Sequence, residues 1–221
     1  MKYKAIIFDM DGTIIDTECV WKKATTDLIA SKGVTLTPEL YKELEVLILG
    51  IAVHKSCQII KDFLKLEHPV EELMKEKVDR AHELFKTGMK FIDGFERFHQ
   101  KVIHFNMPTG IATNADDRTL AHSNEMLGLS NYFGEHIYNI SHVGNKAKPD
   151  PDVYLHVAKQ LKVKPEECIA IEDSAHGIRA AKQAGMFCIG INSAKNREAL
   201  KEADLIIDHY DEILLEELLK K

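Results

Sequence analysis

The stretch YKAIIFDMDGTIIDTE, residues 3–18, ends an apolar run with two carboxylates. The run that closes at Phe8 is typical of a buried strand, and Asp9 and Asp11 follow it with one residue between them. On extended chain, side chains two residues apart leave on the same side, so the two carboxylates are expected to lie close together. Like charges held close raise each other's pKa. Something must compensate for this repulsion, and we expect it to be part of the protein's function.

Short β-branched runs recur along the chain and alternate with helical patterns of about 10 to 15 residues. The expected strands are KAIIFDM (4–10), TGIAT (109–113), HIYNI (136–140), CIAIED (168–173), FCIGIN (187–192) and DLIID (204–208). Strands that alternate with helices indicate an α/β fold with a doubly wound, parallel, Rossmann-like sheet.

One interval breaks this alternation, because residues 17–86 contain helical patterns and no strand signal. Pro38 marks a helix start with Thr37 as its N-cap. The stretch 68–85 has apolar residues mostly three and four apart, which is typical of an amphipathic helix. The sequence thus predicts an inserted, all-helical domain. The expected domains are the α/β core at 1–16 and 87–221 and the helical insert at 17–86.

Polar side chains gather where the expected strands end. In open α/β sheets, ligands bind outside the carboxyl ends of the strands. The groups at these ends are the carboxylates of Asp9, Asp11, Glu172 and Asp173, the hydroxyl of Thr113 and the amide of Asn114. Carboxylates combined with phosphate oxygens suit Mg²⁺. With such a cation bound, one aspartate can stay ionised as a nucleophile while the other holds a proton.

Lys148 offers a positive charge to the same site. It lies in KAKPDPDVYL (146–155), where Pro149 favours extended backbone at the residue before it. Asp150 and Pro151 are predicted to be the N-cap and first turn of the next helix. Lys148 is therefore expected at a strand-to-helix corner, pointing at the carboxylates.

Each of these features also has a purely structural interpretation. Asp9 and Asp11 could form a solvated turn, since Asp-Gly is a common turn signal. Asp173 or Ser174 could cap the helix that follows, a role compatible with metal binding. Lys148 by itself would be an ordinary surface lysine.

Four motifs together favour the functional interpretation. DMDGT (9–13), ATN (112–114), KPDPDVY (148–154) and EDSAHGIRAAKQAGM (172–186) stand in the order and spacing of the haloacid dehalogenase-like hydrolases. The resemblance covers the whole chain. Within the family, the chain resembles the branch with helical caps, whose members include β-phosphoglucomutase, phosphoglycolate phosphatase and pseudouridine-5′-phosphatase. It implies that the helical insert is the cap that closes over the substrate.

The resemblance also implies residue roles. Asp9 would form an aspartyl-phosphate, and Asp11 would protonate the leaving group and later activate water. The implied phosphate-binding residues are Thr113, Asn114 and Lys148. The implied Mg²⁺ ligands are Asp9, Asp11 through its backbone carbonyl, Asp173 and, directly or in the next shell, Glu172.

Composition excludes several other classes of protein. The 221-residue chain has a net charge of -6 with both signs interspersed, which does not suggest a nucleic-acid or membrane surface. The longest uncharged apolar run, residues 46–53, is far below the ~20 residues of a membrane span. No GxxxxGK or GxGxxG occurs, so a nucleotide cofactor is not indicated. Four cysteines without a CxxC pair, and no signal-peptide pattern, favour a reduced, cytoplasmic setting.

The predicted function is a Mg²⁺-dependent phosphatase that acts on a small soluble phosphomonoester. A carboxylate at position 11 favours phosphoester over carbon–halogen chemistry, because an oxygen leaving group must be protonated. The cap sequence resembles that of pseudouridine-5′-phosphatase-like members, which implies a nucleotide-like or sugar phosphate. The only partner expected is this small molecule, and the sequence does not indicate an oligomeric state.

Two alternatives remain open. A β-phosphoglucomutase-like isomerase would share all the core residues, and a non-catalytic binding module is disfavoured because no catalytic position is substituted. The mutase pattern needs a second phosphate grip. The chain departs from it at Ala115 and Asp116, where a serine and a lysine are expected, at Val53 in place of an arginine and at Trp21 in place of a histidine.

Overall fold

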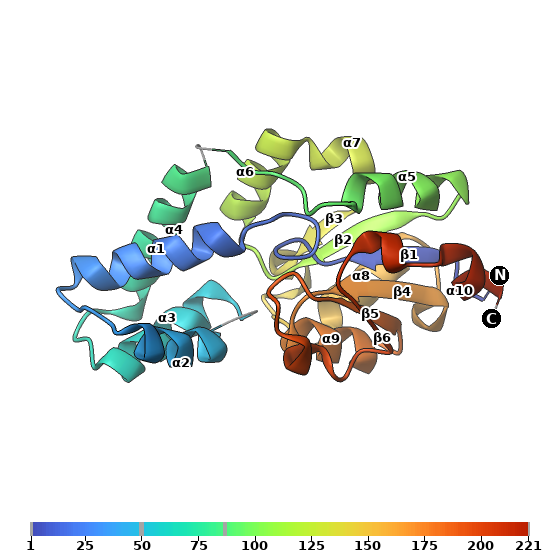
Figure 1. Ribbon diagram of the computed structural model, residues 1–221. Coiled ribbons are helices and arrows are strands. Elements are labelled where there is room, and N and C mark those ends of the chain that lie inside the picture. Colours follow the sequence, from blue (N-terminus) through green and yellow to red (C-terminus); the bar gives the residue numbers. More distant parts are fainter. Residues whose placement is uncertain (1, 49–50, 86–87, 221) are drawn as a thin grey trace. The chain divides into compact units, whose positions relative to one another are not determined.

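The computed structural model describes residues 2–48, 51–85 and 88–220, and the chain divides into two compact units (Figure 1). The first unit comprises Met1–Asp16 and Lys90–Lys221, and the second comprises Thr17–Met89. The expected boundary between residues 86 and 87 lies outside the described residues. Within the first unit, the chain just before residue 17 pairs with the chain just after residue 89, where Ile15 and Phe91 form an antiparallel bridge.

The first unit is built on a six-stranded parallel sheet in the order β3-β2-β1-β4-β5-β6. The strands are β1 (Ala5–Phe8), β2 (Thr109–Thr113), β3 (Ile137–Asn139), β4 (Cys168–Glu172), β5 (Phe187–Ile191) and β6 (Leu205–Ile207). Each falls within an expected strand, which confirms the doubly wound α/β fold. The strand order reverses between β1 and β4, and this is where ligands bind in such sheets.

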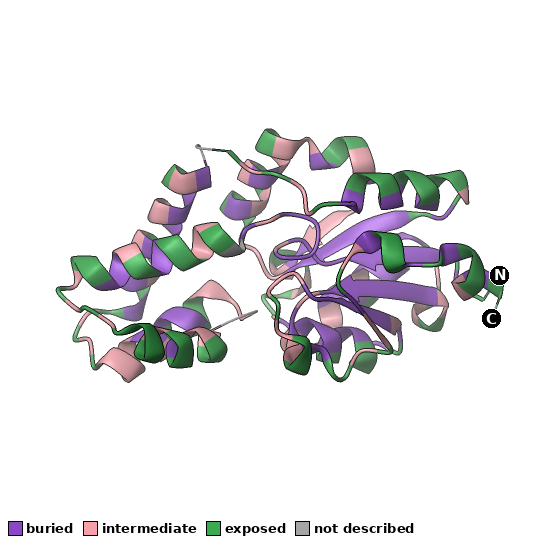
Figure 2. Ribbon diagram, in the orientation of Figure 1, coloured by how far each residue is buried: buried purple, intermediate pink, exposed green. Residues whose placement is uncertain are grey.

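Successive side chains of a strand point to opposite faces, so the apolar strands present apolar side chains on both faces of the sheet. Helices cover both faces, as is usual for parallel sheets. Ile6 and Phe8 of β1 join one apolar cluster, while Ala5 and Ile7 join the other. The first cluster includes residues of α5 (Phe95–His104), α7 (Leu129–Phe133) and α10 (Leu215–Lys220). The second includes residues of α8 (Asp152–Gln160) and α9 (Ala175–Gln183). Figure 2 shows the resulting burial of the strands.

The remaining elements of this unit connect strands to helices. They are α6 (Asp117–Leu127) and the short 3-10 helices η1 (Ile140–Val143), η2 (Pro165–Glu167), η3 (Arg197–Leu200) and η4 (Tyr210–Glu212). All four cysteines of the chain are free thiols.

The second unit is the predicted all-helical insert. Its helices are α1 (Glu18–Ser31), α2 (Pro38–Ile48), α3 (Val53–Leu64) and α4 (Val70–Phe85). The hydroxyl of Thr37 accepts from the backbone N–H of Leu40 at 3.3 Å, which confirms the predicted start of α2. Small apolar clusters hold the helices together, centred on Leu73, Phe85 and Leu44. Among the helices that the structure describes, none has the length and apolar character needed to cross a bilayer.

Two local predictions were wrong. Strand β1 ends at Phe8, so Asp9 and Asp11 lie beyond the strand and the alternation of a strand no longer fixes their directions. Helix α8 begins at Asp152 with Pro151 as its N-cap and no side-chain cap. A turn comes first, in which the backbone N–H of Asp150 donates to the Ala147 carbonyl at 3.1 Å. The residue predicted to be the N-cap is used in this turn.

Candidate active site

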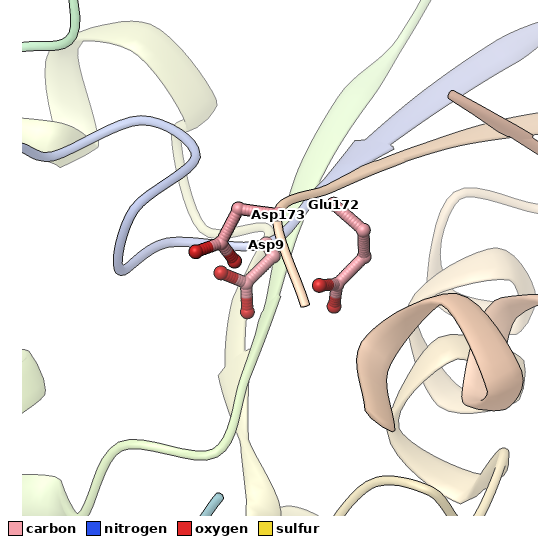
Figure 3. Close-up of side chains that lie close together, drawn as sticks. All are labelled: Asp9, Glu172 and Asp173. Carbon is pink, nitrogen blue, oxygen red and sulfur yellow. The ribbon is translucent and has the colours of Figure 1, made fainter. Parts of the chain in front are cut away.

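Three carboxylates meet where β1 and β4 end. Oxygens of Asp9, Glu172 and Asp173 lie within 4.8 Å of one another, and Figure 3 shows their side chains converging there. Asp9 and Glu172 are buried, and Asp173 is half-buried. The sheet order places this cluster at the point where the order of strands reverses. The structure thus brings together three of the side chains that the sequence placed at strand ends.

Two glycines allow the backbone to approach these carboxylates. Gly12 has a φ of 77°, and a side chain there would overlap the carboxylate of Asp173. A side chain at Gly177 would overlap the carboxylate of Glu172. Neither position tolerates a β-carbon without displacing a group of the site.

The cluster carries more negative charge than its surroundings compensate. Burial raises the pKa of Asp9 to about 7, although the ammonium of Lys148 opposes the shift. Burial also raises the pKa of Asp173 well above its usual value, and the charges of Asp9 and Glu172 add to the effect. Oxygen donors crowded in this way are the ligand set that Mg²⁺ prefers.

Lys148 lies beside these carboxylates, as its predicted position at a strand-to-helix corner implied, and it is buried. Its ammonium donates to Asp9 Oδ1 and Glu172 Oε1, each at 2.6 Å, and to the Ala112 carbonyl at 2.8 Å. Burial works against the charged form, but the two carboxylates outweigh it and hold the pKa of Lys148 above its usual value. The possibility that Lys148 is an ordinary surface lysine is therefore ruled out.

Glu172 is held on both of its oxygens by groups of the chain itself. Oε1 accepts from Lys148 and from the Tyr154 hydroxyl, the latter at 2.8 Å. Oε2 accepts from the Ser174 hydroxyl at 3.1 Å and from the Ser174 backbone N–H at 3.4 Å. These contacts give Glu172 the geometry of a residue that orients Lys148, whereas its role as a direct metal ligand stays a prediction.

Ser174 also has the structural role suggested by the sequence. Its hydroxyl accepts from the backbone N–H of Gly177 at 3.1 Å, so it is the N-cap of α9. Capping and the contact with Glu172 occur together. The serine therefore fixes the start of α9 against the acidic cluster.

The end of β2 is tied to the turn that carries Lys148. Asn114 Oδ1 accepts from the backbone N–H of Lys148 at 2.9 Å. Thr113 Oγ1 accepts from the backbone N–H of Ala115 at 3.1 Å, which leaves its proton able to donate elsewhere. The structure thus gives the Asn114 oxygen a positioning contact, while phosphate binding by either residue stays a prediction.

Asp11 lies in the loop after β1, where it forms a parallel bridge with Ile15. Its side chain is half-buried. Its charge is the smallest of the three contributions that raise the pKa of Asp9, after burial and the charge of Glu172. The paired catalytic role expected for the two aspartates stays a prediction.

Sequence reasoning missed one participant in this site. Tyr154 is fully buried, and burial together with the charge of Glu172 raises its pKa well above the usual value. The available signal was the position of Tyr154 between Val153 and Val157 on the apolar stripe of α8, which indicated a buried hydroxyl in need of an acceptor.

Asp116, one of the departures from the mutase pattern, has a structural role. It is the N-cap of α6, where its carboxylate accepts from the backbone N–H of Thr119 at 2.8 Å and from the Thr119 hydroxyl at 3.2 Å. The negative charge is thereby fixed at the start of α6, close in sequence to the motif ATN.

Comparison with known proteins shows the family of the chain. The family model of the haloacid dehalogenase-like hydrolases matches residues 6–191. A phosphorylated carbohydrates phosphatase from Thermotoga maritima is 29% identical over 205 residues, which cover 92% of both chains. A β-phosphoglucomutase from Bacillus subtilis is 29% identical over 96% of this chain and 92% of its own. The crystal structure of a HAD hydrolase from Entamoeba histolytica matches with a TM-score of 0.83 at 27% identity, over 98% of both chains. As its four motifs predicted, the chain belongs to the haloacid dehalogenase-like hydrolases.

Proposed function

We propose that the protein is a Mg²⁺-dependent phosphatase that hydrolyses a small phosphomonoester through an aspartyl-phosphate at Asp9. The observation that carries the proposal is the buried ammonium of Lys148, 2.6 Å from Asp9 Oδ1, beside a cluster of three carboxylates. An anionic phosphoryl group needs positive charge on several sides. The arrangement supports a nucleophile that is already in contact with one of those charges.

The residues present fit a divalent cation. Crowded carboxylate oxygens and the raised pKa of Asp9 and Asp173 indicate a cluster that lacks positive charge. Asp9, Asp173 and the Asp11 carbonyl would hold Mg²⁺, with Glu172 behind them. The bound ion would supply charge that offsets the phosphoryl oxygens and the nucleophile.

The chain's own groups then divide the reaction into two halves. A carboxylate oxygen of Asp9 attacks phosphorus, the bond to the leaving oxygen breaks, and Asp11 gives that oxygen its proton. In the second half, Asp11 takes a proton from water as the water attacks phosphorus, which releases phosphate and restores Asp9. Lys148 and the Thr113 hydroxyl donate to phosphoryl oxygens throughout.

The substrate class is proposed from the relatives and the cap. Similarity to a phosphatase of phosphorylated carbohydrates supports a sugar phosphate, and a nucleotide-like monoester is the other candidate. A small molecule is the only partner that the proposal requires. The cytoplasmic location expected from the cysteine pattern stays a prediction.

The test is phosphate release from a panel of phosphorylated metabolites, with Mg²⁺ and with a chelator in excess. The proposal expects hydrolysis of at least one sugar or nucleotide-like monoester, lost with chelator and restored by added Mg²⁺. No release from any compound, or release that a chelator leaves unchanged, would contradict it.

A β-phosphoglucomutase-like activity is the second candidate, because a β-phosphoglucomutase is among the relatives. The carboxylate of Asp116 at the start of α6 disfavours a second phosphate near the motif ATN. Phosphorus resonances can be followed after adding β-glucose 1-phosphate with a trace of the bisphosphate. Rapid formation of glucose 6-phosphate with little free phosphate would favour the mutase.

A further inference from the structure

Tyr154 contacts the paired charges of the site from the buried side of α8. Its hydroxyl lies 2.8 Å from Glu172 Oε1 and 3.4 Å from Lys148 Nζ. The ammonium also lies 4.8 Å from the centroid of the phenol ring, within the range of a cation–π contact. A single side chain thus touches both members of the Lys148–Glu172 pair.

Counting protons fixes the direction of these hydrogen bonds. An ammonium has three N–H donors. Those of Lys148 are used by Asp9 and Glu172 at 2.6 Å and by the Ala112 carbonyl at 2.8 Å, all shorter than its contact with Tyr154. The Tyr154 hydroxyl therefore donates to Glu172 Oε1, which receives one neutral and one charged donor.

We propose that Tyr154 is a positioning residue, which fixes Glu172 Oε1 and through it aims the Lys148 ammonium at a phosphoryl group beside Asp9. The proposal rests on the proposed phosphatase function, since it assigns Lys148 to phosphate. A carboxylate that loses its neutral donor turns toward the remaining charged one. Lys148 is then drawn toward Glu172 and away from the phosphoryl group.

The test is a double-mutant cycle read on the affinity for inorganic phosphate, measured by calorimetry in the presence of Mg²⁺. Tyr154→Phe keeps the ring and removes only the hydroxyl, and Lys148→Met removes the charge while keeping the aliphatic volume. Tyr154→Phe alone is expected to weaken phosphate binding roughly ten- to a hundredfold, as for a lost hydrogen bond to a charged group. In the Lys148→Met background the same change should cost less than about threefold, because Tyr154 acts through Lys148.

Tyr210→Phe is the matched control. Tyr210 is equally buried, and its hydroxyl donates to the Thr13 carbonyl at 2.9 Å rather than to the Lys148 pair. Whatever the loss of phosphate affinity that Tyr210→Phe causes, the loss in the double variant with Lys148→Met should equal the product of the two single losses. Circular dichroism checks that each variant folds, and Lys148→Gln replaces Lys148→Met if that variant does not.

Two results would overturn the role of Tyr154. One is phosphate affinity of Tyr154→Phe within about twofold of the wild type. The other is a loss that multiplies with Lys148→Met as the control does, which would mean a general effect on the fold. If the cycle shows coupling between Tyr154 and Lys148 but the wild-type protein hydrolyses no phosphomonoester, the role of Tyr154 is retained and the phosphatase function is rejected. A wild type that binds no phosphate would overturn both.

Discussion

The two units of the chain each bury a lysine, but the two ammonium groups have different surroundings. In the α/β unit, the buried ammonium of Lys148 lies between two carboxylates at 2.6 Å. In the helical unit, Lys77 on α4 is also buried, but it donates only to the Ser56 hydroxyl at 3.1 Å and lies 5.9 Å from the centroid of the Trp21 ring. Within the described residues, no carboxylate pairs with Lys77.

This difference shows where charge is used and where it is only tolerated. Charges in the α/β unit gather at strand ends, where the ammonium of Lys148 is paired and negative charge remains in excess. Perturbed groups of this kind cluster at functional sites. In the helical unit, burial lowers the pKa of Lys77, so its charge is a cost to that unit's stability. Variants of matched chemistry in the two units test the contrast.

Asp9→Asn should give the largest effect. Its amide can still accept from Lys148, so the fold should be kept, but an amide cannot act as the nucleophile. We expect turnover to fall by at least about four orders of magnitude. Phosphate release and the melting temperature are measured together. The matched control is Asp27→Asn in α1, which removes a surface pair with Lys23 and should leave turnover unchanged. An active or unfolded Asp9→Asn would contradict the assignment.

Asp11→Asn should slow both half-reactions, because the residue acts first as the acid and then as the base. The expected loss is about 10² to 10⁴ fold for alkyl phosphates. It should be smaller for nitrophenyl phosphate, since that leaving group needs little protonation. Steady-state rates with both substrates decide the point, and equal losses would mean that Asp11 is not the acid.

Gly177→Ala and Gly33→Ala compare a crowded glycine with an open one. At Gly177 a β-carbon would overlap the held carboxylate of Glu172, so kcat/KM should fall about tenfold or more and stability by about 1–3 kcal/mol. At Gly33, with a φ of 74° and no neighbour within 4 Å, the cost should be about 1 kcal/mol of backbone strain. Urea unfolding and kcat/KM are measured for both. Equal effects on kcat/KM would argue against a tightly held Glu172.

Lys77→Met should stabilise the protein by about 1–3 kcal/mol at neutral pH, since it replaces a desolvated charge by an apolar chain of similar length. The pKa of Lys77 is lowered in the folded state, so the penalty is full at low pH and disappears as pH rises towards the unfolded value of about 10.5. Urea unfolding across that range should show the advantage of the variant shrinking.

Lys32→Met is the control within the same unit. Lys32 pairs with Glu72 at 3.2 Å and Glu76 at 2.6 Å, so losing its charge should destabilise the protein instead. If Lys77→Met destabilised the protein as Lys32→Met does, the ammonium of Lys77 would be a favourable part of the helical unit.

The sequence predicted the strands well because β-branched runs flanked by turn residues leave few alternatives. It failed at the ends of elements, where tertiary contacts decide. The chain leaves β1 at Phe8, and Gly12 then packs against Asp173 from a distant strand end. In the same way, Asp150 is a favourable N-cap by local rules, but it belongs to the turn that carries Lys148, so α8 begins only at Asp152.

The sequence predicted the site residues that lie in a motif at the end of a strand. It did not predict the contact that a helix contributes to the site. Tyr154 stood inside a quoted motif, yet its contact with Glu172 depends on how α8 packs against the sheet. Lys77 had a signal in sequence, because it follows Leu73 by four residues and so falls on the buried stripe of α4. An apolar stripe with one lysine in it is the pattern to look for.

The most direct test of the central claim is to trap the phosphorylated carboxylate. The enzyme is quenched during turnover of its best phosphomonoester with Mg²⁺ and then reduced with borohydride, which converts an acyl phosphate of aspartate to homoserine. Peptide mass spectrometry should find homoserine at position 9, only when substrate is present and not in Asp9→Asn. Turnover without this product, or the modification at another carboxylate, would contradict the account.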